Sequence, residues 1–401
     1  MKPPVKKKNY QAPTLSETSR KIKERLGFVV KDDGKPITTE DLAGSSAEKK
    51  LSFIPMSEAF VEATKLPGIP MGYLTLVAGW SDTGKSTLVN ELIASCVNNG
   101  ILPVYFDTEG NFDYQFAIDC GLKATPVYRE KVNEDTGELY QALVDWDTDL
   151  IYFDKDKLLL QWGKWDYKQN KETSKMRSQA VIEDIAMAIN WFLDLQHEGE
   201  ITQPLCFIWD SIGTISSYAS ISGVKNNMYD AGALSSAFTD IISGRIPGSR
   251  KVSKKYTNTM FCVNKVWNDS MNSLGGVPSI ELKGGKTFFY AARLILHLGG
   301  IAKAATKKLN ATAKGRTYRY GIVTKIRVTK NQLPSPYNIT YEGEMACVHN
   351  GLLSPDRLDE YKKNNVKEIL KRLEEIAADS GDNVEINEAD IDFTEKDEIG
   401  D

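Results

Sequence analysis

Apolar runs and helical repeats alternate along most of this chain. Runs with the length and near-continuous apolar character of strands buried on both faces lie at 73–78, 103–107, 205–210, 259–264, 294–298 and 321–328. Between these runs, apolar positions recur at helical spacing, most clearly in 88–97 and in 181–195. Such alternation is typical of parallel sheets covered by helices. The pattern therefore predicts an α/β fold with a mainly parallel central sheet flanked by helices.

Polar segments flank this predicted core. Residues 1–50 are polar and interrupted by prolines, which predicts an N-terminal arm with one short helix at 16–26. The core itself is expected at 51–348 and carries an insertion at about 151–200. Residues 349–401 are expected to form a C-terminal helix followed by an acidic, disordered tail.

Two long polar stretches interrupt the alternation, at about 216–232 and 265–285. Each stretch follows the carboxyl end of a predicted strand. Ligands bind at that edge of an α/β sheet, and loops of this length are usually either functional or disordered. Both stretches are therefore candidates for ligand binding, and flexible loops without a ligand explain their composition equally well.

Charge is distributed unevenly along the chain. The net charge is −4, but residues 374–401 hold twelve acidic side chains and one basic one, so the rest of the chain carries +7. A basic body with an acidic tail is common where the body binds a polyanion and the tail competes for the same surface. A tail that only keeps the protein soluble explains the charge equally well.

Composition narrows the class of protein only a little. Hydrophobic residues make up 41% and charged residues 26%, as in ordinary globular proteins, and no apolar run reaches the length of a membrane span. The five cysteines are widely spaced and lack the spacing of a zinc site. We expect no membrane contact, reduced thiols and a cytoplasmic location, which for a viral protein means the host cytoplasm.

One motif carries most of the chemical information. The stretch Gly79, Trp80, Ser81, Asp82, Thr83, Gly84, Lys85, Ser86 and Thr87 fits the G-x-x-x-x-G-K-[ST] pattern and lies between a predicted strand and a predicted helix. Backbone N–H groups of such a loop, together with the helix N-terminus, bind phosphate. Lys85 is expected to neutralise the outer phosphates and Ser86 to ligate Mg²⁺, which predicts a nucleoside triphosphate site.

Two carboxylates at strand ends complete a nucleotide-hydrolysing site. Asp210 ends an apolar run and is expected to bind Mg²⁺, with Ser211 beside it, whereas Glu109 follows the strand that ends at Asp107 and is expected to act as catalytic base. The simpler interpretations are that Asp210 caps a helix and that Glu109 is an exposed loop carboxylate.

The order of these motifs resembles the RecA-type recombinases, including the bacteriophage UvsX-like members, over about 55–345. The resemblance rests on the phosphate loop, the strand ends Phe106-Asp107-Thr108-Glu109 and Trp209-Asp210-Ser211, and Val263-Asn264 before a glycine-rich stretch. It implies a P-loop ATPase core that uses ATP and Mg²⁺ with Glu109 as the general base.

The resemblance also implies roles for residues near the nucleotide. Asp113 and Phe116 would contact adenine, and Lys330 would reach the ATP of a neighbouring subunit. Asn264 opens the second loop, where the family places a glutamine next to sense the γ-phosphate. This chain has Lys265 at that position, which can contact a phosphate as a point charge but cannot accept a hydrogen bond as an amide does.

The two polar stretches match the family's DNA-binding loops. Candidate contacts to single-stranded DNA are Lys225, Asn226 and Asn227 in the first stretch and Lys283, Gly284, Gly285 and Lys286 at the end of the second. Basic clusters at 245–255 and 303–319 are candidates for contact with a second, double-stranded DNA. The implied activity is self-association into a filament on single-stranded DNA, with homologous pairing and strand exchange.

Two other functions fit the same residues. The first is a ring-forming helicase or motor ATPase of the same core fold, which predicts a closed ring and processive unwinding. The second is an ATP-switched scaffold that binds a protein partner through the 151–200 insertion. The scaffold predicts ATP turnover that DNA does not stimulate.

Overall fold

The computed structural model describes residues 48–133, 137–222, 227–268, 280–282, 285–300, 304–379 and 386–397. The chain separates into two compact units, of which the smaller contains residues up to Lys50 together with Arg250–Lys255. Within this smaller unit, Glu48 pairs with Lys251 through an antiparallel bridge and with Arg250 through an ion pair. The helix predicted at 16–26 lies outside the described residues.

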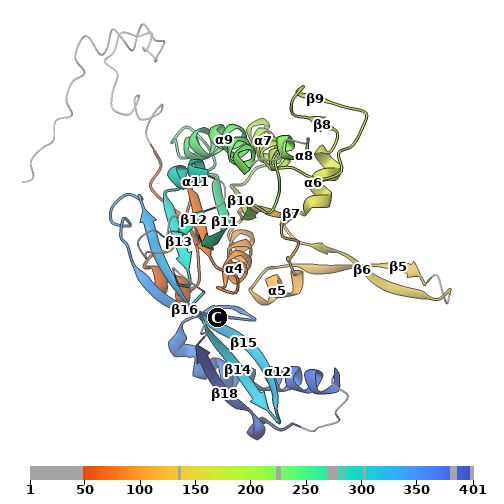
Figure 1. Ribbon diagram of the computed structural model, residues 1–401, viewed down its shortest axis with the longest axis vertical. Helices are drawn as coiled ribbons and strands as arrows, with labels where there is room; N and C mark the ends of the chain where they lie inside the picture. Colours follow the sequence, from red (N-terminus) through yellow and green to blue (C-terminus); the bar gives the residue numbers. More distant parts are fainter. Residues whose placement is uncertain are drawn as a thin grey trace, which may run out of the picture. The chain divides into compact units, whose positions relative to one another are not determined.

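The larger unit, Leu51–Ser249 with Tyr256–Asp401, is built on one large mixed sheet (Figure 1). Its middle strands run parallel in the order β13-β3-β11-β10-β4-β7. Their bounds are β3 Leu74–Gly79, β4 Leu102–Asp107, β7 Ile151–Phe153, β10 Leu205–Ile212, β11 Thr259–Asn268 and β13 Leu294–Leu298. The predicted α/β architecture is confirmed in this region.

The sheet continues on the β13 side with antiparallel strands, which makes it mixed where the sequence predicts a mainly parallel one. These strands are β15 Arg316–Asn331, β16 Glu342–Val348 and β17 Gly351–Leu353. Short connections between β15, β16 and β17 are long enough only for antiparallel pairing, since a parallel pair needs a crossover of a dozen or more residues.

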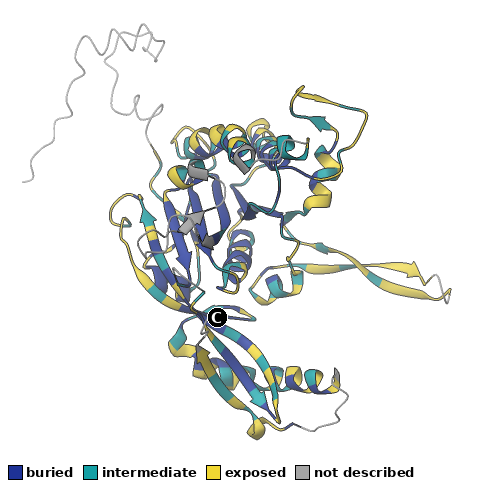
Figure 2. Cartoon of the chain, viewed as in Figure 1, coloured by how far each residue is buried: buried dark blue, intermediate teal, exposed yellow. Residues whose placement is uncertain are grey.

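Helices cover both faces of the parallel strands. Along β10, Cys206 and Ile208 join one apolar core with α4, whereas Leu205, Phe207 and Trp209 join the other with α7 and α9. Figure 2 shows these central strands as buried. The described α-helices of this unit are α3 Glu58–Thr64, α4 Lys85–Asn98, α5 Tyr114–Asp119, α6 Lys155–Trp162, α7 Ile182–Glu198, α8 Tyr218–Ile221, α9 Asn227–Asp240, α10 Ile246–Gly248, α11 Gly285–Ala291 and α12 Leu358–Asp379.

A third apolar cluster lies in the C-terminal part of the unit. Strand β14 (Lys307–Ala313) pairs with the first half of β15, and α12 packs on the pair. Strand β18 (Asp392–Asp397) pairs with β14 and brings Phe393 edge-on to Tyr320, 5.8 Å between ring centroids. The segment expected to be a disordered acidic tail therefore contains a strand, because Phe393 has an aromatic partner to pack against.

The two polar stretches predicted as loops contain regular structure. The first includes α8 and the start of α9, and the second includes the end of β11 and the short strand β12 (Ile280–Leu282), which pairs with β11. Helix α9 forms although its sequence is rich in small residues, because Leu234 and Phe238 are buried in the core that contains Trp209.

Two hairpins were not predicted from the sequence. Strands β5 (Thr125–Val132) and β6 (Leu139–Asp147) form a separate, largely exposed two-stranded sheet. Strands β8 (Trp165–Asp166) and β9 (Lys171–Glu172) form another between α6 and α7.

Candidate nucleotide-hydrolysing site

The phosphate-loop motif joins a buried strand to a helix. Strand β3 ends at Gly79 and α4 begins at Lys85, with Gly84 between them at φ +87°. A Cβ on Gly84 would lie 2.3 Å from the sulfur of Cys347, and a Cβ on Gly79 would lie 2.7 Å from the Leu298 carbonyl oxygen. Neither position has room for a side chain, so the loop conformation depends on both glycines.

Within the loop, the carbonyl oxygen of Trp80 accepts hydrogen bonds from the Thr83 hydroxyl, at 2.8 Å, and from the Lys85 ammonium. Burial lowers the pKa of Lys85, while the nearby carboxylates of Asp210 and Glu109 oppose this shift. The cation therefore lies within the field of both carboxylates that the sequence assigns to hydrolysis.

The sheet order brings the predicted catalytic residues together. Strand β11 lies between β3 and β10, with Lys265 in register with Gly79, and β4 lies on the other side of β10. The Lys265 ammonium is 3.1 Å from a carboxylate oxygen of Glu109, and the Ser211 hydroxyl donates a hydrogen bond to the same oxygen. Asn264, the preceding residue on β11, is buried.

Asp210 is a buried carboxylate that suits a divalent cation. Its side chain is 8% exposed, and burial followed by the charge of Glu109 raises its pKa to about 7. Among the described residues, none donates a hydrogen bond to this carboxylate. A buried carboxylate without a hydrogen-bond donor suits Mg²⁺, because proteins usually bind this ion through one or two carboxylates together with substrate phosphates.

Ser86 is the residue whose hydroxyl is predicted from the sequence to bind the same ion. It is exposed and lies in the first turn of α4. Across the described ranges, no three His, Cys, Asp or Glu side chains are grouped so as to hold a metal by themselves. A Mg²⁺ ion at Asp210 and Ser86 would therefore need phosphate oxygens from the nucleotide to complete its ligands.

The position of Glu109 depends on Asp107, a residue for which no role is predicted from the sequence. One carboxylate oxygen of Asp107 accepts hydrogen bonds from the backbone N–H groups of Glu109, at 3.1 Å, and Gly110, at 2.8 Å. The other accepts from the Phe112 N–H, at 3.0 Å, and the Tyr152 hydroxyl, at 3.2 Å. Asp107 thus fixes the turn after β4, and the Asp-x-x-Gly spacing was the available signal for it.

Thr108 links the same turn to β10. Its hydroxyl accepts a hydrogen bond from the Trp209 indole at 3.1 Å and lies 3.1 Å from the Ser211 carbonyl oxygen. Its backbone N–H donates to the Asp210 carbonyl oxygen at 2.8 Å. The two strand ends that hold Glu109 and Asp210 are therefore tied together beyond the sheet ladder.

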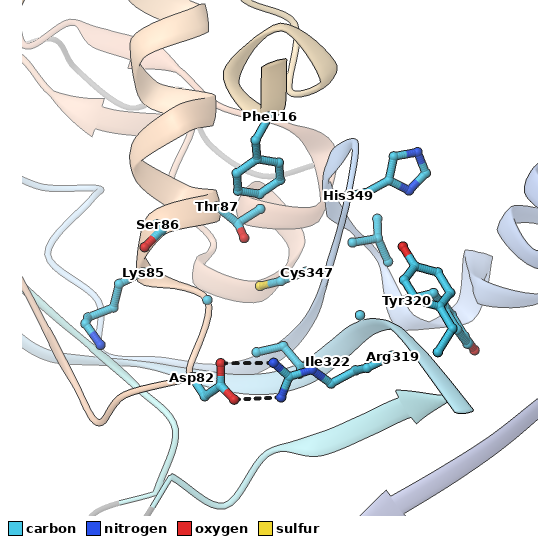
Figure 3. Close-up of a pocket in the computed structure, with 14 residues that line it drawn as sticks. Asp82, Lys85, Ser86, Thr87, Phe116, Arg319, Tyr320, Ile322, Cys347 and His349 are labelled. Atoms are coloured by element: carbon cyan, nitrogen blue, oxygen red, sulfur yellow. Dashed lines mark hydrogen bonds and ion pairs between the residues drawn. The ribbon is translucent and has the colours of Figure 1, made fainter. Parts of the chain in front are cut away.

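A cavity of about 380 Å³ opens beside Lys85, Ser86 and Thr87 (Figure 3). This volume is within the range of small-molecule sites. Phe116 lines the cavity, as a base-stacking residue should. Asp113 is absent from the described lining, and its carboxylate caps α5 by accepting the Gln115 N–H at 2.8 Å.

The sequence did not predict the opposite wall of this cavity. Tyr318, Arg319 and Tyr320 of β15 line it together with His349, which follows β16. The Arg319 guanidinium pairs with Asp82 of the phosphate loop at 2.6 Å, and both side chains are about half exposed. An ion pair with this exposure contributes little to stability.

Lys330 lies at a different place from this cavity. Its ammonium donates hydrogen bonds to the carbonyl oxygens of Phe289, at 2.8 Å, and Tyr290, at 3.1 Å, near the end of α11. It is not among the described residues that line the cavity. The structure therefore does not bring Lys330 together with Lys85 and Glu109 within one chain.

Three of the seven predicted DNA contacts lie within the described residues. Lys225, Asn226, Lys283 and Gly284 lie outside the described residues. Asn227 begins α9, and Gly285 and Lys286 begin α11, so these three belong to helices where the sequence predicts loops.

Two arginines of the predicted basic clusters have acidic partners inside the unit. Arg319 pairs with Asp82 as described above, and Arg245 pairs with Asp194 at 2.5 Å. These pairings weaken the case for either arginine as a contact to duplex DNA.

Comparison with known proteins gives a distant relationship. The chain is 25% identical over 134 residues to the protein named RecA in two strains of Ureaplasma parvum serovar 3, and the match covers 32% of this chain and 40% of each relative. No family model matches the chain. Within the described ranges, every helix is too short or too polar to span a bilayer. The similarity suggests a distant RecA-like relationship over about a third of the chain, and the α/β fold is compatible with it.

Proposed function

We propose that this chain is a DNA recombinase that binds ATP and Mg²⁺ at Gly79–Thr87, forms a filament on single-stranded DNA and promotes homologous pairing and strand exchange with double-stranded DNA. One observation carries the proposal: Lys85, Glu109, Asp210 and Lys265 converge at the carboxyl ends of neighbouring parallel strands. Ligands bind at this edge in open α/β sheets. The distant similarity to RecA supports the same function.

In the proposed ATP hydrolysis each of these residues has a task. Glu109 accepts the proton of the attacking water, and the contacts from Lys265 and Ser211 hold its carboxylate in one orientation. Lys85 neutralises charge on the outer phosphates. When bound, Mg²⁺ supplies further positive charge at the β- and γ-phosphates. Phe116 stacks on the base in the adjoining cavity.

The position of Lys330 supports a site completed by a second subunit. Its ammonium lies outside the cavity of its own chain but is fixed by two carbonyl oxygens and by the ring of Phe289, 5.2 Å away. A fixed cation at a surface position suits contact with the phosphates of a neighbouring chain. Hydrolysis then depends on filament assembly.

Strand β11 offers a route from nucleotide to DNA. Lys265 contacts Glu109, and three residues further on Asn268 pairs with Ile280 of β12. The strand that holds a cation at the hydrolytic carboxylate therefore leads directly into the second stretch assigned to DNA. A shift of Lys265 toward the γ-phosphate would act on that hairpin.

ATP hydrolysis measured with and without single-stranded DNA tests the proposal. The wild type should hydrolyse ATP faster with DNA, Lys85→Ala should lose ATP binding, and Glu109→Gln should bind ATP but turn it over at least about 100-fold more slowly. Glu200→Gln, an exposed carboxylate on the same chain, is the matched control. Turnover and assembly that do not respond to DNA would sink the recombinase function, and closed rings in electron micrographs would favour a motor ATPase.

A further inference from the structure

A projecting segment between α6 and α7 carries a cluster of exposed lysines outside the ATP site. This lysine arm, residues 164–177, contains strands β8 and β9 joined by an exposed turn (Figures 1 and 2). It holds four lysines and Arg177 against two carboxylates. Because Arg177 is paired with Asp184 of α7, the remaining net charge of the arm is +2. Lys164, Lys168, Lys171 and Lys175 are all exposed.

Carboxylates within reach neutralise little of this charge. Across the described part of the chain, Lys164, Lys168 and Lys175 form no ion pair with an acidic side chain. The Asp166 carboxylate instead accepts hydrogen bonds from the backbone N–H groups of Lys168 and Gln169, each at 2.9 Å. These bonds close the turn and lower the pKa of Asp166, with the bond from Gln169 as the largest cause. The carboxylate is therefore already engaged by backbone N–H groups.

The base of the arm is fixed by buried polar contacts. Arg177 pairs with Asp184 of α7 at 2.6 Å, with side chains 10% and 0% exposed, and the Tyr167 hydroxyl donates to the same carboxylate at 2.6 Å. Arg177 also donates to the carbonyl oxygens of Trp162, at 2.8 Å, and Gly163, at 3.2 Å. The lysines therefore project from a rigid base, which reduces the entropy lost on binding a ligand.

The same base contacts the beginning of α8. The rings of Tyr167 and Tyr218 meet edge to face at 5.7 Å, and the Arg177 guanidinium lies 5.3 Å and 5.8 Å from their centroids. The Tyr218 backbone N–H donates to Glu183 of α7 at 2.9 Å. Tyr218 is the first residue of α8 and lies within the stretch assigned to single-stranded DNA, so the arm and that stretch share one support.

We propose that the lysine arm binds the phosphate backbone of single-stranded DNA next to α8 and extends the path of the strand beyond the two loops. This inference rests on the proposed function. Exposed lysines on a rigid, aromatic-lined base suit sequence-independent contact with phosphates, because each ammonium acts as a point charge and needs no base-specific geometry.

Salt dependence of binding tests the arm. The probe is a fluorescein-labelled oligothymidylate, titrated with the full chain, Mg²⁺ and a poorly hydrolysed ATP analogue between roughly 50 and 300 mM salt. The variant combines Lys164→Gln, Lys168→Gln, Lys171→Gln and Lys175→Gln. Each lost phosphate contact removes about 0.7 from the slope of log K against log salt, so four contacts should reduce it by about 3 and weaken binding on the order of 100-fold near 0.1 M.

A second variant controls for loss of net charge. It combines Lys123→Gln, Lys363→Gln, Lys367→Gln and Lys371→Gln, which are exposed lysines on other elements. A smaller slope for the arm variant than for this control supports the inference, provided both variants keep the wild-type unfolding temperature. Equal slopes would overturn the inference and leave the recombinase function standing. A wild type that fails to bind the probe would instead remove the proposed function and the inference with it.

Discussion

Replacing Asp210 with asparagine should stabilise the nucleotide-free protein in a pH-dependent way. Asp210 is 8% exposed and lies close to Glu109 and Asp107, two further carboxylates. Burial raises its pKa from the usual 3.8 to about 7, and the charge of Glu109 adds to this rise. The folded protein therefore binds a proton at Asp210 over a pH range in which the unfolded chain has already released it.

The size and sign of the effect follow from that difference. A rise of about 3 pH units, at 1.36 kcal/mol per unit, corresponds to about 4 kcal/mol. Because the folded pKa is the higher one, the stabilisation linked to protonation is complete below the unfolded value of 3.8 and is lost as the pH rises through about 7. Asparagine does not titrate, so its advantage over aspartate should grow by roughly 2–3 kcal/mol between pH 5 and pH 8.

Urea unfolding with a metal chelator present, followed by tryptophan fluorescence at several pH values, measures this difference. Asp149→Asn makes the same chemical change at an exposed position and should alter the unfolding free energy by less than about 0.5 kcal/mol. Mg²⁺ with ATP should then stabilise the wild type more than Asp210→Asn, because ligand binds only the folded state. A difference between Asp210→Asn and wild type that stays constant from pH 5 to pH 8 would refute the reasoning.

Four further substitutions test individual contacts. Phe116→Ala should weaken ATP binding about tenfold and leave the turnover number within about twofold, because stacking on a base is worth roughly 1–3 kcal/mol; a fall in turnover with unchanged affinity would argue against a base at this ring. Lys265→Met should lower ATP turnover about tenfold by releasing Glu109 from its 3.1 Å partner, and unchanged turnover would show that the ion pair does not position the base. Gly84→Ala should destabilise the protein by at least about 2 kcal/mol more than Gly100→Ala in thermal unfolding, since both glycines have positive φ but only Gly84 lies against Cys347. Arg177→Met should cost about 3–5 kcal/mol because it leaves Asp184 buried without its cation, and hydrogen exchange confined to 164–184 would locate the loss.

Much of the fold could be predicted because its signals are local. The middle strands are buried on both faces, so each reads as a continuous apolar run regardless of its neighbours. The start of α9 lies in a stretch predicted as a loop, because Asn227 and Gly232 have weak helical preference. The helix is stabilised by Leu234 and Phe238 in the core. The β5–β6 hairpin has a local signal in the Val- and Tyr-containing segments on either side of Gly137.

The site separates in the same way into local and distant features. Glu109 and Asp210 lie at one edge of the sheet, as the sequence predicts, because a carboxylate at the end of a buried apolar run is a sequence pattern and parallel strands bring such ends together. The wall formed by Tyr318, Arg319 and Tyr320 could not be predicted, since Arg319 reaches Asp82 across 237 positions of sequence. From the sequence, Arg319 belongs to a basic cluster, and such a cluster is a candidate contact with DNA when the fold is unknown.

The role of Lys265 in any coupling between ATP and DNA cannot be predicted from its identity alone. On the sequence, it is a lysine where the resembling family has a glutamine, and that substitution left its role open. The register of β11 against β3 places Lys265 opposite Gly79, and the Lys265 ammonium lies 3.1 Å from Glu109. A glutamine amide could hydrogen-bond to either group without changing its charge, whereas a lysine neutralises whichever anion it contacts. The consequence of the substitution is therefore electrostatic, and it acts first on the carboxylate that the proposed hydrolysis requires.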